Sequence, residues 1–319
     1  MTKQQVSKNA SILFLISLAL NIAIVVAAYI LAKFGITMGI WATVLAEAAL
    51  FIPTLLYLTK NGEPVLSTLG FHKIKVSTIF LTILLNIVIT PIWMFGNVFS
   101  QLFVPNVVAQ GVTSMMENSA GPVILVVSLL PPLFEEMFFR GLLFNKYKNV
   151  STLIKAALLS AFFFGILHLN LNQFCYAFLL GVIFAFVNVA SGSIVTSMIM
   201  HFLINAGNVL LLYVSSLAMQ MVGQDAAAAA TQTPSKSYLM TFAAVLLVLS
   251  VVAAFLAKLI MQSIAKREGH LEEFNSIFKK NSTQSEETVH IFRTTPSLFS
   301  TVLGVVSIAV ISFYLPNVF

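Results

Sequence analysis

Long, continuously apolar runs separated by short polar stretches dominate this sequence, and they predict its fold. A helix needs about 20 mainly apolar residues to cross a bilayer, and nine runs approach that length. The strict alternation of a membrane β-barrel is absent, so the expected architecture is an all-α, polytopic membrane helix bundle with eight to nine transmembrane helices. The nine expected segments are 11–32, 38–58, 76–98, 122–145, 153–169, 173–190, 194–216, 238–262 and 297–317.

The composition agrees with this pattern. Of 319 residues, 59% are hydrophobic and 9% are charged, whereas a soluble domain carries about 25% charged residues. These values exclude a soluble globule, a disordered chain and a disulfide scaffold, since Cys175 is the single cysteine. The first apolar run follows Lys3 and Lys8, but it is too long for a cleaved signal peptide, so we expect an uncleaved helix.

Lysine and arginine predict the orientation of the bundle. With the N-terminus in the cytoplasm, 14 of the 17 basic residues fall in cytoplasmic segments, as the positive-inside rule requires. Only Lys33 and Lys236 then lie outside, and Arg140 lies within a span. The excess of basic residues on the cytoplasmic side accounts for the basic pI, so the pI does not indicate that the protein binds nucleic acid. An even number of spans would put the last loop on the wrong side, or would make one span re-entrant.

The chain divides into three parts. Residues 1–119 are expected to form N-terminal transmembrane helices, and residues 120–216 a core that holds the chemistry. Residues 217–319 contribute C-terminal helices and a polar cytoplasmic loop at 263–296, with a short surface helix expected around 270–280.

Charged residues inside the apolar segments are the strongest functional signal. A charge at mid-membrane costs about 2.5–3.5 kcal/mol on insertion scales, so such residues usually have a function. Glu136 and Arg140 are four residues apart and can pair on one helix face. Glu135 points about 100° away and need not be neutralised by that pair. Pro131 and Pro132, one turn earlier, should loosen the helix and free backbone carbonyls.

Two histidines are expected at a similar depth. Glu135 is 13 residues from Lys148, and His168 is 13 residues from Lys155, so both should lie about 20 Å from the cytoplasmic ends of their helices. His201 begins a polar stripe that continues with asparagines, and tilt can bring it to the same level. A carboxylate in a dry pocket can act as a base, and His and Asn can stabilise an oxyanion.

Zinc is a second interpretation of these residues. The HExxH motif of helix-borne zinc sites is absent, as are a Ser-His-Asp order and a GxSxG motif. A metal held by Glu135, His168 and His201 is nevertheless sterically conceivable.

Three short motifs resemble those of one family. Glu135–Arg140 matches EExxxR, Phe164–His168 matches FxxxH, and His201–Asn205 matches HxxxN. Each motif is weak alone, but all three occur in order on three expected spans, about 30 residues apart. Residues 120–215 therefore resemble the CAAX protease and bacteriocin-processing family (CPBP, also called Abi).

The resemblance implies a glutamate-dependent intramembrane endopeptidase. Glu135 would be the general base, assisted by His168, and His201 with Asn205 would form the oxyanion site. The supporting residues would be Glu136, Arg140 and Phe164. No cofactor is expected, and zinc is the less favoured alternative. The expected partners are a peptide or membrane-protein substrate and the lipid bilayer, with no nucleic acid. The expected location is a bacterial plasma membrane.

Two other classes of function remain open from the residues. The same polar groups could serve a non-catalytic peptide-binding immunity or regulatory protein, or a proton-coupled transporter. Against a transporter, no inverted repeat is evident, and the polar groups gather at one depth. Glu47, the remaining intramembrane acid, is expected to bond to a neighbouring helix or to lie near an interface.

Overall fold

The computed structural model describes residues 2–224, 234–279, 291 and 294–314, and in this part the regular elements are all helices. This confirms the expected all-α fold. In chain order the helices are α1 (Lys3–Lys33), α2 (Ile40–Lys60), α3 (Val65–Thr68), α4 (Val76–Val88), α5 (Thr90–Ser100), α6 (Val107–Glu136), the π-helix η1 (Met137–Phe144), α7 (Asn145–Lys148), α8 (Leu153–Leu167), α9 (Leu171–Ser191), α10 (Val195–Met221), α12 (Lys236–Glu268), α13 (Leu271–Ser276) and α14 (Thr295–Tyr314).

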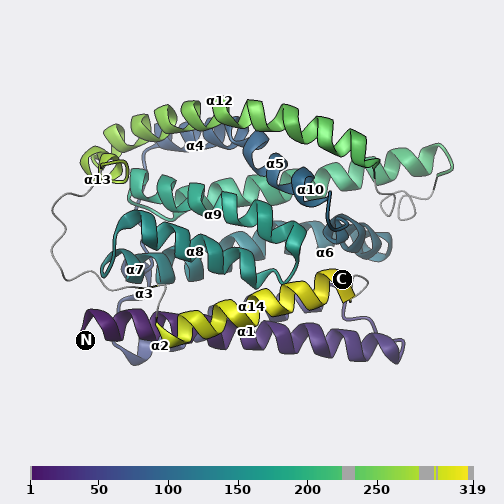
Figure 1. Ribbon diagram of the computed structural model, residues 1–319, viewed down its shortest axis with the longest axis horizontal. Coiled ribbons are helices and arrows are strands. Elements are labelled where there is room, and N and C mark those ends of the chain that lie inside the picture. The colour runs from purple at the N-terminus through teal and green to yellow at the C-terminus, as the bar shows by residue number, and fades with distance from the viewer. Residues whose placement is uncertain (1, 225–233, 280–290, 292–293, 315–319) are drawn as a thin grey trace.

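Eight helices in the described residues are long and apolar enough to cross a membrane, so the chain is a multi-pass membrane protein. The predicted segment 153–169 forms the shorter helix α8. Its 15 residues extend about 22 Å, less than the roughly 30 Å of a bilayer core. The helix ends at Leu167, and Leu169 has a left-handed φ of 53° that turns the chain into α9. In chain order, the short helix α8 follows η1 and α7 and precedes α9, and it lies beside α9 (Figure 1).

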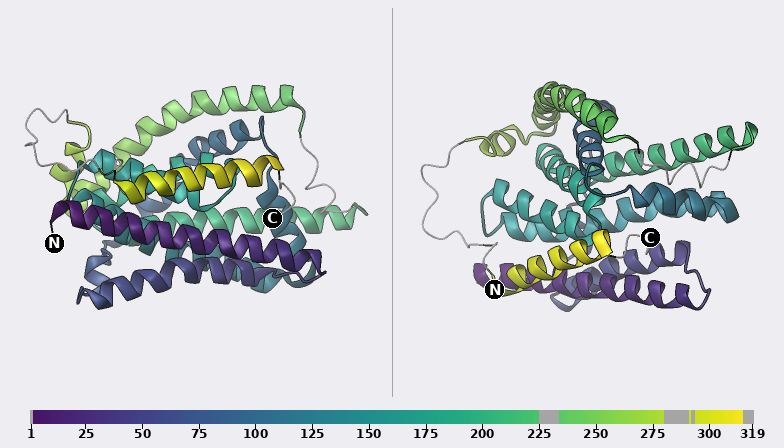
Figure 2. Two further views of the ribbon diagram at one scale, coloured as in Figure 1. Left: turned by 60° about the horizontal axis from the view of Figure 1, so that its bottom comes forward. Right: turned by 45° about the vertical axis from the view of Figure 1, so that its right-hand side comes forward.

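The helices lie in three layers along the long axis of the molecule (Figure 1). One outer layer holds α12 with α4 and α5, and the other holds α1, α2 and α14. Between them lie α6, α8, α9 and α10, most of whose residues fall in the predicted core 120–216. The turned views show the same grouping, with α1, α2 and α14 together on one side (Figure 2). The short helix α13 lies within the range 270–280 where a surface helix was expected.

The layers pack most tightly around η1, whose eight residues are all buried. Phe14 of α1 stacks on Phe163 of α8 with ring centroids 4.0 Å apart, and meets Phe139 of η1 edge-on at 6.3 Å. Gly141 allows α3 to approach, because a Cβ atom there would lie 3.0 Å from the carbonyl oxygen of Leu69. The segment that follows the two glutamates is therefore held rigidly from several sides.

Candidate active site

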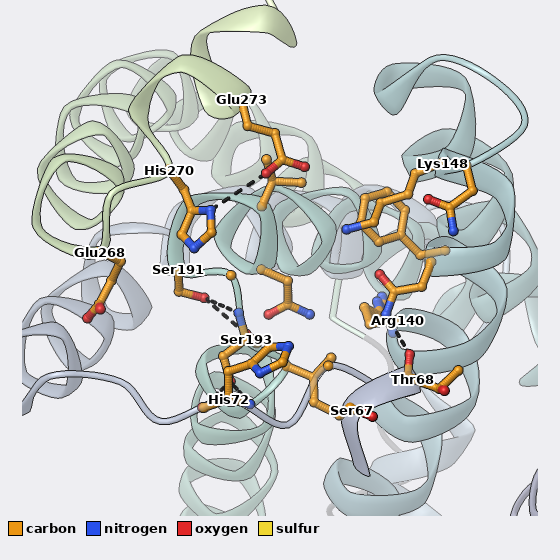
Figure 3. Close-up of a pocket in the computed structure, with 18 of the residues that line it drawn as sticks. Ser67, Thr68, His72, Arg140, Lys148, Ser191, Ser193, Glu268, His270 and Glu273 are labelled. Carbon is orange, nitrogen blue, oxygen red and sulfur yellow. Dashed lines mark hydrogen bonds and ion pairs between the residues drawn. The ribbon is translucent and has the colours of Figure 1, made fainter. Parts of the chain in front are cut away.

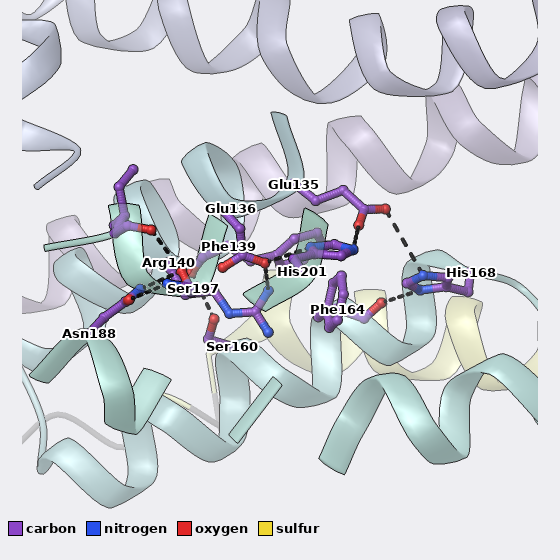
Figure 4. Close-up of polar contacts among 11 residues, drawn as sticks. Glu135, Glu136, Phe139, Arg140, Ser160, Phe164, His168, Asn188, Ser197 and His201 are labelled. Carbon is purple, nitrogen blue, oxygen red and sulfur yellow. Dashed lines mark hydrogen bonds and ion pairs between the residues drawn. The ribbon is translucent and has the colours of Figure 1, made fainter. Parts of the chain in front are cut away.

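Three neighbouring helices supply the polar residues predicted to form the site. Glu135 and Glu136 are the last two residues of α6, and Arg140 lies in η1. His168 caps the end of α8, and His201 lies in the first two turns of α10. A π-helical turn inside a longer helix often marks a functional site, and here it directly follows the glutamates. The side chains from these three helices meet in the interior of the middle layer (Figure 4).

The expected pair of Glu136 and Arg140 is present. Arg140 Nη1 donates to Glu136 Oε1 at 3.0 Å, and both side chains are fully buried. The guanidinium carbon lies 4.2 Å from the ring centroid of Phe164 and 5.2 Å from that of Phe184. Its Nη2 atom has space only because residue 181 is glycine, where a Cβ atom would lie 2.9 Å away. The carboxylate of Glu136 and the rings of Phe164 and Phe184 thus hold the guanidinium group of Arg140 in place.

His201 connects the two glutamates. Its Nδ1 atom lies 3.0 Å from Glu136 Oε1, and its Nε2 atom lies 3.6 Å from Glu135 Oε2. The short distance makes Nδ1 the donor to the Glu136 carboxylate, because a carboxylate only accepts. Glu136 is therefore shared by Arg140 and His201, while Glu135 has no such close partner.

His168 approaches Glu135 from the other side (Figure 4). Its Nδ1 atom lies 2.8 Å from the carbonyl oxygen of Phe164, and a carbonyl only accepts, so Nδ1 carries the proton. The Nε2 atom then faces Glu135 Oε1 at 4.0 Å, too far for a direct hydrogen bond. Phe164 also packs edge-on against His168 and His201, with ring centroids 5.0 and 5.9 Å apart.

Asn205, expected beside the oxyanion, also makes a structural contact. Its Nδ2 atom donates to the carbonyl oxygen of Val127 at 3.2 Å. In a regular helix that carbonyl would accept from residue 131, but Pro131 has no N–H. The HxxxN asparagine thus satisfies a carbonyl freed by the double proline and ties α10 to α6. One N–H of its amide remains for another acceptor.

Glu47 was expected to bond to a neighbouring helix or to lie near a membrane interface, and its surroundings in the structure differ from this expectation. It is only 5% exposed, and its Oε2 atom is buried with no hydrogen-bond partner. It is also close enough to Glu135 for the two carboxyl groups to interact electrostatically. Phe51, one turn later in α2, packs on Phe134 with ring centroids 4.5 Å apart. Its charge within an apolar helix was the only sequence signal of this position.

Two buried hydrogen bonds that support the site were not predicted from sequence. Ser160 of α8 donates to the carbonyl oxygen of Phe139 at 2.7 Å, and Asn188 of α9 donates to Ser197 of α10 at 2.9 Å. The first bond joins α8 to η1, and the second joins α9 to α10, which carries the HxxxN motif (Figure 4). Nothing in the sequence distinguishes these residues from other polar residues in apolar helices.

The donor set of one glutamate and two histidines is of a kind that zinc accepts. Across the part of the chain that the structure describes, however, no group of three or more His, Cys, Asp or Glu residues is arranged so that it could hold a metal ion.

Fold and site together define a multi-pass helical membrane protein with a buried cluster of carboxylates, imidazoles and one guanidinium. Residues 117–207 match a family model described as type II CAAX prenyl endopeptidase Rce1-like. The match includes all three motifs and confirms the resemblance to the CAAX protease family. It makes the chain similar to intramembrane endopeptidases of the CAAX-protease type. Comparison with curated proteins and with solved structures gave no match.

Proposed function

We propose that this protein is an intramembrane endopeptidase that hydrolyses a peptide bond with a water molecule activated by Glu135. The observation that carries this proposal is the different surroundings of two adjacent glutamates. Glu136 is held by Arg140 and His201 at 3.0 Å each, whereas Glu135 faces the two histidines at 3.6 and 4.0 Å. Glu135 is therefore the carboxylate that is free to take a proton.

His168 is suited to hold the attacking water together with Glu135. In the neutral ring its proton is on Nδ1, so Nε2 accepts a hydrogen bond. A water molecule that donates to both Nε2 and Glu135 Oε1 keeps an oxygen lone pair for the substrate carbonyl. As the new C–O bond forms, Glu135 takes one proton from the water. It then gives this proton to the leaving amine as the C–N bond breaks.

His201 is proposed to stabilise the oxyanion, and this requires a particular protonation state. Its Nδ1–H donates to Glu136, so Nε2 can donate only if the ring is an imidazolium. The carboxylates of Glu135 and Glu136 on either side would supply the counter-charge for that cation. The second N–H of Asn205, beyond the one given to Val127, is proposed as the other donor to the oxyanion.

Metal ions have no part in the proposed reaction, since water is activated by the carboxylate itself. We expect cleavage by the purified protein to persist after exhaustive chelation and buffer exchange. Loss of cleavage that is restored by adding Zn²⁺ would instead favour the zinc alternative.

The activity can be tested before a substrate is identified. Membranes from cells producing the wild-type protein or Glu135→Gln should differ in their peptides, and the wild type should generate new termini within or near apolar segments. Glu63→Gln is the control for loss of a carboxyl group outside the motifs, because Glu63 pairs with Lys146 and not with a residue of the proposed site. Identical peptide profiles for the wild type and Glu135→Gln would contradict the proposal and favour the non-catalytic alternative.

A further inference from the structure

Glu47 of α2 is a buried acid that the proposed reaction leaves without a role. It is 5% exposed, and it forms no ion pair with any of the described residues. Its Oε2 atom is buried without a hydrogen-bond partner in this part of the chain. An unpartnered polar group in an apolar interior costs free energy, and an acid within a membrane segment usually has a function. The position of Glu47 therefore indicates a function beyond packing.

Helix α2 places Glu47 beside the candidate active site. Phe51, one turn after Glu47, packs on Phe134 with ring centroids 4.5 Å apart. Residues four apart share a helix face, so Glu47 lies on the face of α2 that packs against the end of α6. Glu135 directly follows Phe134, and its carboxyl group is close enough to that of Glu47 for an electrostatic interaction. Glu135 Oε2 is likewise buried without a hydrogen-bond partner. Two carboxyl groups, each with an unpartnered oxygen, thus lie near each other.

The charges of the candidate active site balance without Glu47. Glu135 and Glu136 are carboxylates in the proposed reaction. Arg140 and His201 carry the two positive charges that balance them. A third carboxylate would leave an uncompensated negative charge in the apolar interior, which is costly. Two neighbouring carboxyl groups in such surroundings share one proton, as in the aspartic proteases.

Glu47 is the member of this pair that should hold the shared proton. Glu135 Oε2 lies 3.6 Å from His201 Nε2, and Glu135 also interacts electrostatically with Arg140. Both cations stabilise the Glu135 carboxylate. Glu47 has no basic partner among the described residues, so nothing there compensates a charge on it.

The lysine-rich end of the bundle supplies no counter-charge for Glu47. A polar cavity of about 590 Å³ at this end has four walls: the linker between α2 and α4, η1 with α7, the α9–α10 turn and the α12–α13 turn (Figure 3). Its lysines, Lys73 and Lys148, share the cavity with two carboxylates, and Glu47 does not line it. Glu47 is also 13 residues from Lys60 at the end of α2, or about 20 Å along the helix.

Tyr176 of α9 brings another O–H group within electrostatic reach of Glu135. Its hydroxyl forms a hydrogen bond with Gln173 of the same helix, so it already has a partner. The protonated Glu47 carboxyl has a donor without a partner among the described residues. A hydrogen bond between this donor and the unpartnered oxygen of Glu135 would satisfy both buried groups.

We propose that Glu47 is a positioning residue of the candidate active site: it carries a proton and donates it in a hydrogen bond to Glu135 Oε2, directly or through one water molecule. The bond fixes the orientation of the Glu135 carboxylate and leaves Oε1 for the attacking water beside His168. It adds no charge to the cluster. The catalytic part of this inference depends on the endopeptidase activity proposed above, whereas the proton on Glu47 does not.

Infrared difference spectroscopy of the purified full-length protein tests this proton without a substrate. A protonated carboxyl group has a carbonyl stretching band that a carboxylate lacks. We expect the wild type to show this band at neutral pH and Glu47→Gln to lose it, whereas Glu63→Gln retains it. Glu135→Gln should retain the band at a shifted frequency, because the acceptor of the Glu47 proton changes. A band that persists in Glu47→Gln, or that is unshifted in Glu135→Gln, would overturn the proposal.

Three variants test the positioning role on a peptide that the wild type cleaves. Glu47→Met removes the donor and keeps an unbranched side chain, so kcat should fall by about 10- to 100-fold, the effect of losing one hydrogen bond to a charged group. KM should change little, and thermal stability should not fall, because the unpartnered buried oxygen is removed. Glu47→Gln keeps a donor and should restore most of the lost kcat. Tyr176→Phe, the matched control, should keep the wild-type kcat.

Two kinetic results would overturn the positioning role. One is an unchanged kcat in Glu47→Met or an equal loss in Glu47→Gln. The other is a loss of thermal stability in Glu47→Met that parallels the loss of kcat, which would show that Glu47 serves the fold. The two proposals also fail separately. If the wild type cleaves no peptide while the infrared bands behave as expected, the endopeptidase proposal fails and the pair of Glu47 and Glu135 stands.

Discussion

Glu135 and Glu136 have the same chemistry and adjacent positions, yet their surroundings differ because successive residues of a helix point about 100° apart. The spacing to Arg140 was enough to predict which glutamate forms the ion pair. It could not predict that His201 bonds to the paired glutamate through Nδ1 and faces the free one through Nε2. That arrangement depends on how α10 packs on α6, which no local pattern encodes.

Glu136 should be important for stability, because its loss leaves the fully buried Arg140 guanidinium without a counter-charge. We expect Glu136→Gln to lower the free energy of unfolding by about 3–5 kcal/mol, measured by denaturation in detergent. The double variant Glu136→Leu/Arg140→Met removes both charges and should be less destabilised. Unchanged stability of Glu136→Gln would show that the pair contributes nothing to the fold.

Gly181 should tolerate no side chain. A Cβ atom there would lie 2.7 Å from Ala161 Cβ and 2.9 Å from Arg140 Nη2, so Gly181→Ala should cost about 1–3 kcal/mol through overpacking. Gly207 is the control, since a Cβ atom at this helical position meets no atom within 4 Å. Equal thermal stability of Gly181→Ala and Gly207→Ala would contradict the packing described around Arg140.

Helix α6 illustrates what sequence can say about a whole element. Pro131 and Pro132 predicted a loosened helix with freed carbonyls, and the structure has an uninterrupted helix from Val107 to Glu136 followed by a π-helix. The sequence did not indicate which group satisfies the freed carbonyls. The answer, Asn205 on α10, lies 78 residues from Val127 and is fixed only by helix packing.

The contact between Asn205 and Val127 predicts a specific rescue. Asn205→Ala leaves the Val127 carbonyl without a partner and should cost about 1–2 kcal/mol. Pro131→Ala restores an N–H at the position that normally bonds to this carbonyl, so Asn205→Ala should cost less in that background. A double-mutant cycle measures this coupling. Additive effects would show that the asparagine does not serve the carbonyl in this way.

The positions of the long apolar helices were largely predictable, because the length and hydropathy of a spanning segment follow directly from the bilayer. The predicted segments correspond to observed helices, with α8 shorter than expected. Its end was predicted to within two residues, since the expected segment 153–169 stops before the polar residues Asn170, Asn172 and Gln173. The four-walled cavity was not predictable, because its walls are far apart in sequence.

The orientation itself is a prediction that labelling can test. In a Cys175→Ser background, single cysteines at Gln4 and Glu272 should react only with reagents that reach the cytoplasm. Cysteines at Phe34 and Ser237 should react with impermeant reagents added from outside. All four positions are exposed, and the basic residues remain in place. The opposite labelling pattern would place the lysine-rich end outside the cell.

The claim that Glu135 activates the water is tested most directly by comparing wild-type protein with Glu135→Gln on a peptide found in the membrane comparison. The side chain is 7% exposed and its Oε2 atom has no hydrogen-bond partner, so glutamine should fit without loss of thermal stability. We expect cleavage to fall by at least about 100-fold, the size of a lost general base. A folded Glu135→Gln protein that cleaves at the wild-type rate would contradict the mechanism.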